Sequence, residues 1–287
     1  MGIPNALIAD AYYRACLDEL RAPKAGNVHD FADGHDMTVS DFEVSAEVTR
    51  DWIARPKAPV GKRVRGAIAA TRAAVGCNTN LGIVLMSAPI ALAAERSEAK
   101  DLRAATGRVL DALSLDDAAE VFAAIVLAQP AGLGDAPSHD VRAPATVTLL
   151  EAMRSAERRD RIAWNYAHGL ADVFDIGIPA LGQGLARWDN WQWAVAAAHF
   201  AFMSAFPDTN IVRAHDAAAA EAARQEATKI HTRMQQAENP QSLLGDVLAL
   251  DERLKALGHN PGTSADLTVA TVFAFRLSDP LAVSRQG

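Results

Sequence analysis

Apolar residues recur every three or four positions along most of this 287-residue chain, which is the spacing of one buried face on an α-helix. Ile8, Tyr12 and Ala15 form one such stripe near the start. The pattern predicts helices over about residues 4–20, 40–53, 62–75, 81–94, 98–113, 116–127, 146–174, 190–206, 214–227 and 243–257, and a last one that begins at about residue 261.

Local signals predict where several helices begin and end. Ser40 and Glu43 form a capping box, so a helix is expected to begin at Ser40. Residues 178–184 contain one proline and two glycines and are expected to break the preceding helix. The Pro- and Gly-rich segment 129–145 is the least helical part of the chain. A loop of this length is usually a lid, a binding loop or a disordered connector, and we favour a lid.

The composition favours helices over sheets. Apolar residues make up 50% of the chain but aromatic residues only 6%, so small and aliphatic side chains must fill the core. Such side chains let helices pack closely. We therefore expect an all-α fold, a compact multi-helix bundle in which residues 1–287 form a single large domain.

Charge and cysteine content exclude several classes of protein. The formal net charge is −7 and no basic stripe is present, so the electrostatic pattern of a nucleic-acid-binding protein is missing. The two cysteines cannot form a disulfide framework, and the start of the chain has no signal-peptide pattern. The most apolar stretch, residues 81–94, is too short to cross a membrane and contains Pro89. We expect a cytoplasmic protein without a nucleic-acid or membrane partner.

Four short segments that carry Gly or Asn stand at the beginnings of predicted helices, and each also carries a carboxylate or an amide. A helix N-terminus presents unpaired N–H groups, which suits phosphate, while carboxylates suit a divalent cation. Ordinary helix caps and turns use the same residue types, so each segment alone has a structural explanation as well. The segments are Pro23–Val28 continuing into Gly34–Met37, then Gly76–Gly82, Asp208–Asn210 and Asn260–Leu267.

Taken in order, these segments resemble the triphosphoribosyl-dephospho-CoA synthase family, and the resemblance runs from about residue 19 to residue 275. A fifth stretch, Ala156–Ala163 followed by Tyr166, looks like the family's central helix. The resemblance implies an all-helical enzyme that uses ATP and 3′-dephospho-CoA to make a triphosphoribosyl precursor and releases adenine. It also implies a dephospho-CoA-like acceptor and small-molecule partners, and a homodimer is compatible with it.

The resemblance also suggests residue roles. The catalytic candidates are Asp36, Asp208 and Asp266, which we expect to converge around one hollow large enough for a polyanion. Candidate Mg²⁺ ligands are Asp36, Asp160 and Asp208, although a salt bridge to a neighbouring arginine explains Asp160 equally well. The residues expected to bind the nucleotide are Lys24, Gly26, Asn27, Asn78, Thr79, Asn80, Asn210, Asn260 and Thr263.

One departure from the family pattern leaves other reactions open. Citrate-lyase members of the family read Asn-Thr-His-Lys-Gly where this chain reads Asn78-Thr79-Asn80-Leu81-Gly82, so a cationic side chain that could face phosphate is absent. One alternative is phosphoribosyl or phosphoryl transfer to a different acceptor in another cofactor pathway. A second alternative is a metal-dependent phosphohydrolase that uses His-Asp pairs. A third is a protein that binds the nucleotide but does not turn it over.

Overall fold

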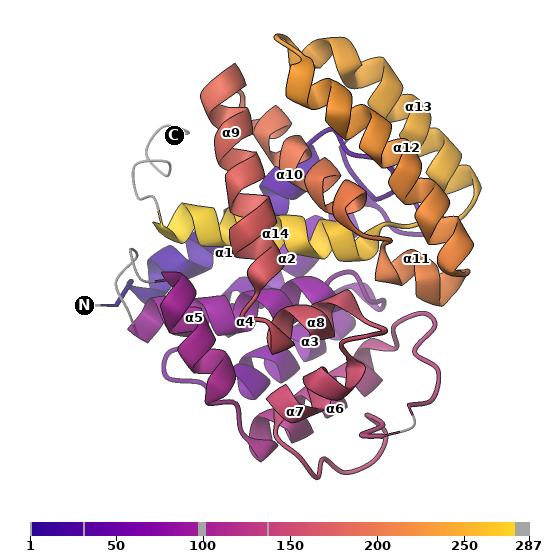
Figure 1. Ribbon diagram of the computed structural model, residues 1–287. Helices are drawn as coiled ribbons and strands as arrows, with labels where there is room; N and C mark the ends of the chain where they lie inside the picture. The colour runs from indigo at the N-terminus through magenta and orange to yellow at the C-terminus, as the bar shows by residue number, and fades with distance from the viewer. Residues whose placement is uncertain (1, 31, 97–101, 137, 279–287) are drawn as a thin grey trace. The chain divides into compact units, whose positions relative to one another are not determined.

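The computed structural model describes residues 2–30, 32–96, 102–136 and 138–278. Within these residues the chain is helical, with two isolated β-bridges, His29 with Ala32 and Gly34 with Met37, and no strand. The predicted all-α fold is confirmed (Figure 1). None of the described helices is long and apolar enough to cross a membrane.

The contacts within the chain divide it into two compact units. Unit 1 comprises residues 1–15, 41–171 and 273–287, and unit 2 comprises residues 16–40 and 172–272. Helices α1 (Asn5–Arg21) and α14 (Gly262–Ser278) contribute residues to both. The single-domain organisation stays a prediction.

In unit 1, α3 packs against both α6 and α4, α4 packs against α5, and α7 packs against α8. Helix α4 is buried on all sides from Ile83 to Ala94, as expected for an apolar helix without a polar face. The helices of this unit are α2 (Val39–Ile53), α3 (Val60–Val75), α4 (Leu81–Arg96), α5 (Leu102–Asp111), α6 (Leu115–Ala128), α7 (Leu149–Ala156) and α8 (Arg161–Ala167).

Helix α4 runs through Pro89 without interruption, and another helix supplies a donor for the carbonyl that the proline leaves without one. Pro89 has no N–H to donate to the carbonyl of Leu85, four residues earlier. The hydroxyl of Tyr166, on α8, donates to that carbonyl at 2.7 Å. Tyr166 therefore satisfies a buried acceptor that α4 alone would leave unpaired.

Unit 2 is organised around α10, which packs against both α9 and α12. Gly184 of α9 permits a close approach, since a Cβ there would lie 3.0 Å from the Cα of Ala194 on α10. Helix α12 also packs against α13 (Figure 1). The elements of this unit are the π-helix η2 (Asp172–Gly177), α9 (Ile178–Trp188), α10 (Trp191–Ala205), α11 (Thr209–Ala214), α12 (Ala217–Gln236), the 3₁₀-helix η3 (Pro240–Leu243) and α13 (Leu244–Ala256).

Several helix boundaries differ from the sequence predictions, among them those of the following segments. The pattern predicts one helix over residues 146–174, but the chain breaks after Ala156 and again at Gly169 and Leu170, both of which have positive φ angles. Residues 178–184, expected to break a helix, instead form the start of α9, because Pro179 lies in its first turn, where no N–H is needed. Helix α2 begins at Val39, whose N–H is accepted by Asp33 at 3.0 Å, so Ser40 lies inside the helix and is not its cap.

The loop between α6 and α7 is confirmed as non-helical over its described residues, while its role as a lid stays a prediction. Pro137 in this loop, and the first residues of the helix predicted over 98–113, lie outside the described residues.

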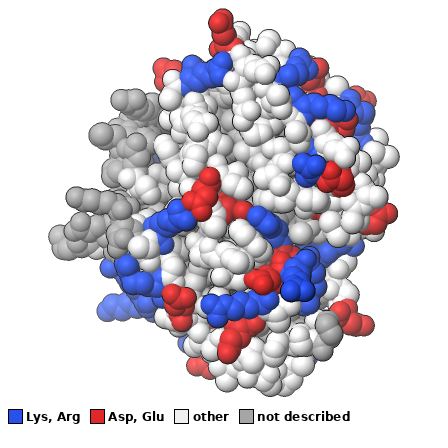
Figure 2. All heavy atoms as spheres, viewed as in Figure 1, with Lys and Arg blue, Asp and Glu red and all other residues white. Residues whose placement is uncertain are grey.

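Charged side chains of opposite sign lie next to one another on the face of the molecule in Figure 2. The structure also contains ion pairs between charged side chains. On and beside α12, for example, Arg224 contacts Glu221 at 2.6 Å and Arg233 contacts Asp246 at 2.8 Å. On this face, the basic groups are thus interspersed with acids.

Candidate functional site

Three of the segments singled out in the sequence meet in unit 2. The side chain of Asn27 donates to Oδ1 of Asn260 at 2.8 Å, and the side chain of Asn210 donates to the backbone carbonyl of Asn260 at 3.1 Å. The hydroxyls of Thr209 and Thr263 lie 3.1 Å apart. Residues separated by 50 to 233 positions in the sequence therefore form one hydrogen-bonded cluster, which we call the amide cluster: Asn27, Asn210 and Asn260.

Lys24 is fully buried and holds the turn that precedes Asn27. Its ammonium group pairs with the carboxylate of Glu19, at the end of α1, and donates to Oδ1 of Asn27 at 3.0 Å. Burial lowers the pKa of Lys24 and raises the pKa of Glu19. The ammonium group is occupied by protein partners, so this geometry gives Lys24 a structural role, and its predicted contact with phosphate stays untested.

Gly26 allows the same turn to approach the beginning of α14. Its φ angle is +77°, and a Cβ at this position would lie 2.7 Å from Cδ of Pro261. Only glycine adopts this conformation in so narrow a space without strain. The glycine at position 26 therefore has a steric reason, while its predicted contact with the nucleotide stays a prediction.

Asp251 and Lys255, which the sequence analysis missed, anchor this turn from α13. The carboxylate of Asp251 accepts the N–H of Gly26 at 2.8 Å and lies 3.2 Å from Nε2 of His29 and 3.0 Å from Nζ of Lys255. Burial by itself would raise the pKa of Asp251, but the hydrogen bonds and charges of His29 and Lys255 lower it. Asp251 lies four residues after Val247 on the apolar stripe of α13. An acid on a face that is otherwise apolar is the sequence feature that could have identified Asp251 as a buried, hydrogen-bonded residue.

Asp208 is buried and joins the beginnings of two helices. One carboxylate oxygen accepts the N–H of Asn210 at 2.9 Å, at the start of α11, and the other accepts both the N–H and the hydroxyl of Ser264 at 2.8 Å, in the first turn of α14. Burial raises the pKa of Asp208 even though these hydrogen bonds favour the charged form. The carboxylate thus occupies the N-terminal N–H groups of α14 that a phosphate would otherwise use.

His35 and Asp36 form a strained turn. Their φ angles are 57° and 59°, in the left-handed region that residues with a side chain seldom adopt. Nε2 of His35 donates to the carbonyl of Gly26 at 2.8 Å, so this turn is tied to the one that contains Lys24. Asp36 itself is exposed. Histidine and aspartate enter this region more readily than most residues with a side chain, and the role of Asp36 stays a prediction.

The acids Asp36, Asp208 and Asp266 all belong to unit 2, but they differ in exposure. Asp36 is exposed, Asp208 is buried, and Asp266 is half-buried in α14, two residues after Ser264. Their convergence around one hollow stays a prediction. His199 lies fully buried in α10, and burial is the main cause that lowers its pKa to about 3.

The fourth segment, Asn78–Asn80, belongs to unit 1. Asn78 accepts the N–H of Leu81 at 3.1 Å and so caps α4, while the hydroxyl of Thr79 lies 2.6 Å from that of Ser45. The carbonyl oxygen of the Asn80 side chain accepts from Thr71 at 3.1 Å, but its buried Nδ2 has no hydrogen-bond partner among the described residues. A buried donor without a partner is costly and is consistent with a group that a substrate completes.

Asp160, also in unit 1, caps α8 by accepting the N–H of Ala163 at 3.0 Å. Among the described residues, no group of three or more His, Cys, Asp or Glu side chains is arranged to hold a metal ion. The predicted Mg²⁺ ligands belong to different units, Asp36 and Asp208 to unit 2 and Asp160 to unit 1, and their joint role stays a prediction. Mg²⁺ bound to nucleotides needs only one or two protein carboxylates, because phosphates and water supply the other ligands.

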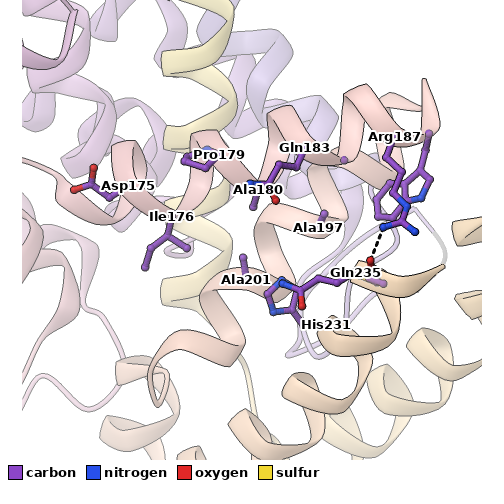
Figure 3. Close-up of a pocket in the computed structure, with 13 residues that line it drawn as sticks. Asp175, Ile176, Pro179, Ala180, Gln183, Arg187, Ala197, Ala201, His231 and Gln235 are labelled. Carbon is purple, nitrogen blue, oxygen red and sulfur yellow. Dashed lines mark hydrogen bonds between the residues drawn. The ribbon is translucent and has the colours of Figure 1, made fainter. Parts of the chain in front are cut away.

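A separate pocket of about 440 Å³ lies in unit 2 between η2, α9, α10 and α12 (Figure 3). Apolar side chains such as Ile176 and Met234 form part of its wall, and Arg187, Gln183 and His231 provide polar groups. The guanidinium group of Arg187 already donates to the backbone carbonyls of Gln235 and Gln236. None of the residues predicted from the sequence lines this pocket.

The class of enzyme follows from a comparison of the chain with known protein families. The described residues are helical, and the family that the chain matches is one of transferases. It belongs to the ATP:dephospho-CoA triphosphoribosyl transferase family, whose sequence profile matches residues 5–284. The resemblance stated from the sequence is thereby confirmed, and the other reactions considered there are not favoured.

A solved structure shares the fold. It is a crystal structure of a candidate triphosphoribosyl-dephospho-CoA synthase from Archaeoglobus fulgidus, with a TM-score of 0.64 and 22% sequence identity, and the match covers 84% of this chain and 98% of that one. At this identity the likeness supports the fold alone. The comparison with curated proteins found no significant match.

Proposed function

We propose that this protein transfers the triphosphoribosyl group of ATP to the hydroxyl of 3′-dephospho-CoA and releases adenine. Membership of the family over residues 5–284 carries this proposal. The joining of three of the predicted segments in one cluster of unit 2 supports it, because the cluster contains the amides expected to bind the nucleotide. The proposal implies a cytoplasmic enzyme with small-molecule partners, and a homodimer is compatible with it.

The reaction breaks the bond between the ribose C1′ and the adenine nitrogen and forms a bond from C1′ to the acceptor oxygen. The acceptor hydroxyl loses a proton and adenine gains one, so no redox partner is needed. Positive charge develops on the ribose ring in the transition state, and nearby carboxylates stabilise it. Asp36 and Asp266 are our candidates for this role and for taking the proton of the hydroxyl.

Asp208 contributes mainly by positioning in this proposal. Its carboxylate accepts three hydrogen bonds from Asn210 and Ser264 and therefore fixes the beginnings of α11 and α14 relative to each other. Asn210 donates one of these bonds, and Thr263 directly precedes Ser264. We expect both Asn210 and Thr263 to contact the nucleotide. Loss of Asp208 would displace both residues. A direct catalytic role for Asp208 stays a prediction.

Mg²⁺ is the cation that we propose for the triphosphate. The exposed carboxylate of Asp36 is available to it, whereas the carboxylates of Asp208 and Asp160 already accept N–H groups. When bound, the ion would neutralise part of the triphosphate charge.

Asn80 is our candidate for the residue that distinguishes this chain from the citrate-lyase members of its family. Its buried Nδ2 has no partner in the described part of the chain. Asn80 and Leu81 stand where the citrate-lyase members have His-Lys, so this chain lacks the cationic side chain at this segment. We therefore expect a weaker attraction for a phosphate there.

The experiment is an incubation of the purified protein with ATP and Mg²⁺, with and without 3′-dephospho-CoA, followed by chromatography of the products. The proposal predicts adenine in amounts equal to the dephospho-CoA consumed. Adenine that forms equally well without dephospho-CoA, or release of inorganic phosphate in its place, would contradict the proposed acceptor.

A further inference from the structure

The buried ammonium group of Lys24 determines how the side-chain amide of Asn27 is oriented. A lysine ammonium donates hydrogen bonds and accepts none. Since Nζ of Lys24 lies 3.0 Å from the side chain of Asn27, the amide must turn its oxygen toward Lys24. Glu19 pairs with the same ammonium group and holds it in place. The orientation of Asn27 is therefore set by the chemistry of its neighbour.

The orientation of Asn27 in turn determines the orientation of Asn260. The NH₂ group of Asn27 faces Asn260 and donates to its Oδ1 at 2.8 Å. The amide of Asn260 must then direct its own NH₂ group away from Asn27. The side chain of Asn210 also holds the backbone carbonyl of Asn260 at 3.1 Å, so both its main chain and its side chain are fixed.

The NH₂ group of Asn260 donates to no protein atom in the described part of the chain. The residue is only half-buried, so a ligand can reach this group. A donor with a fixed direction favours an oxygen acceptor, and it would repel another N–H donor. Phosphate oxygens are strong acceptors of this kind.

We propose that Lys24 is a positioning residue, which acts through Asn27 to direct the NH₂ group of Asn260 toward a phosphate oxygen of ATP. This assignment differs from the sequence expectation, in which Lys24 contacts the phosphate itself. It rests on the proposed function for the identity of the nucleotide. The observation that carries it is the unbroken series of contacts from Glu19 to Asn260.

The test is the affinity for ATP with Mg²⁺, measured by isothermal titration calorimetry on the full chain. Asn260→Ala removes the donor without adding charge and should weaken ATP binding about ten- to hundredfold, the range for one hydrogen bond to a charged group. Asn27→Asp leaves Asn260 unchanged, but an aspartate cannot donate to its Oδ1. Asn260 should then turn its NH₂ group toward the introduced carboxylate, and ATP affinity should fall by a similar factor.

Asn239→Asp is the matched control. Oδ1 of Asn239 accepts the N–H of Gln241 at 3.0 Å at the start of η3, and an aspartate accepts it equally well. The ATP affinity of the Asn239→Asp variant should stay within about twofold of the wild-type value. Thermal melting checks that each variant is folded. If Asn27→Asp does not fold, Asn27→Ala replaces it and should weaken ATP binding more than Asn239→Asp does.

The outcomes separate this inference from the proposed function. ATP affinities of Asn260→Ala and of the Asn27 variant within twofold of wild type would overturn the inference, even if the wild-type protein releases adenine. A loss at Asn260→Ala alone would overturn the part played by Lys24 and Asn27. A wild-type protein that binds ATP tightly through Asn260 but releases no adenine would refute the proposed function and leave the inference standing. Absence of ATP binding by the wild type would overturn both.

Discussion

Replacement of Asp208 by asparagine tests whether this acid joins two helices. In the native protein one carboxylate oxygen accepts an N–H from Asn210, and the other accepts an N–H and a hydroxyl from Ser264. An asparagine has only one oxygen, so its NH₂ group must face an N–H donor on one side or the other. A buried donor left without an acceptor costs about 1–3 kcal/mol. Relief from burying a charge, seen in the raised pKa of Asp208, reduces this cost in part.

We therefore expect Asp208→Asn to lower the free energy of unfolding by about 1–3 kcal/mol, measured by urea denaturation at pH 7. Asp216→Asn is the control, because Asp216 is exposed and caps α12 by accepting the N–H of Ala219 at 2.8 Å. Asparagine caps a helix as well as aspartate does, so this variant should lie within about 0.5 kcal/mol of wild type. Equal stability of the two variants would refute the assignment of Asp208 to the junction of α11 and α14.

Two further predictions concern buried groups outside the amide cluster. Tyr166→Phe should lower the free energy of unfolding by about 1–3 kcal/mol, because the carbonyl of Leu85 opposite Pro89 loses its donor; an unchanged urea midpoint would contradict this role. The pKa of His199 is about 3 in the folded protein and near 6.5 in the unfolded chain. Below pH 6.5 the unfolded chain therefore binds a proton that the folded protein does not bind. The contribution of neutral His199 to stability is lost as the pH falls. His199→Phe should remove up to about 1.4 kcal/mol per pH unit from the decline of stability between pH 6 and pH 4, and an unchanged slope would refute the assignment.

The helices could largely be predicted from the sequence, because their apolar spacing reflects burial on one face. The prediction failed where backbone geometry decided the outcome. Residues 146–174 have a helical pattern throughout, yet Gly169 and Leu170 adopt positive φ angles and interrupt it. Pro179 has the residue type of a helix breaker, but it lies in a first turn, and the sequence alone does not distinguish these two positions well.

The segments of the candidate site were predicted, but not the residues that hold them. Turns rich in Gly and Asn are visible in the sequence because they use few residue types. The contacts of Glu19 and Asp251 depend on how the chain folds back on itself, and Asp251 is 225 residues away from Gly26. The contacts of Lys24 could not be predicted from the sequence either. Its residue type suggested phosphate binding, whereas in the structure Lys24 is buried and pairs with Glu19.

The most direct test of the whole account is the release of adenine by the wild-type protein. Purified protein, ATP, Mg²⁺ and 3′-dephospho-CoA are incubated together, and adenine and the modified dephospho-CoA are quantified by chromatography and mass spectrometry. We predict equal amounts of adenine and of a product that carries the triphosphoribosyl group. Intact ATP at the end of the incubation, or its conversion to ADP and phosphate, would contradict the central claim.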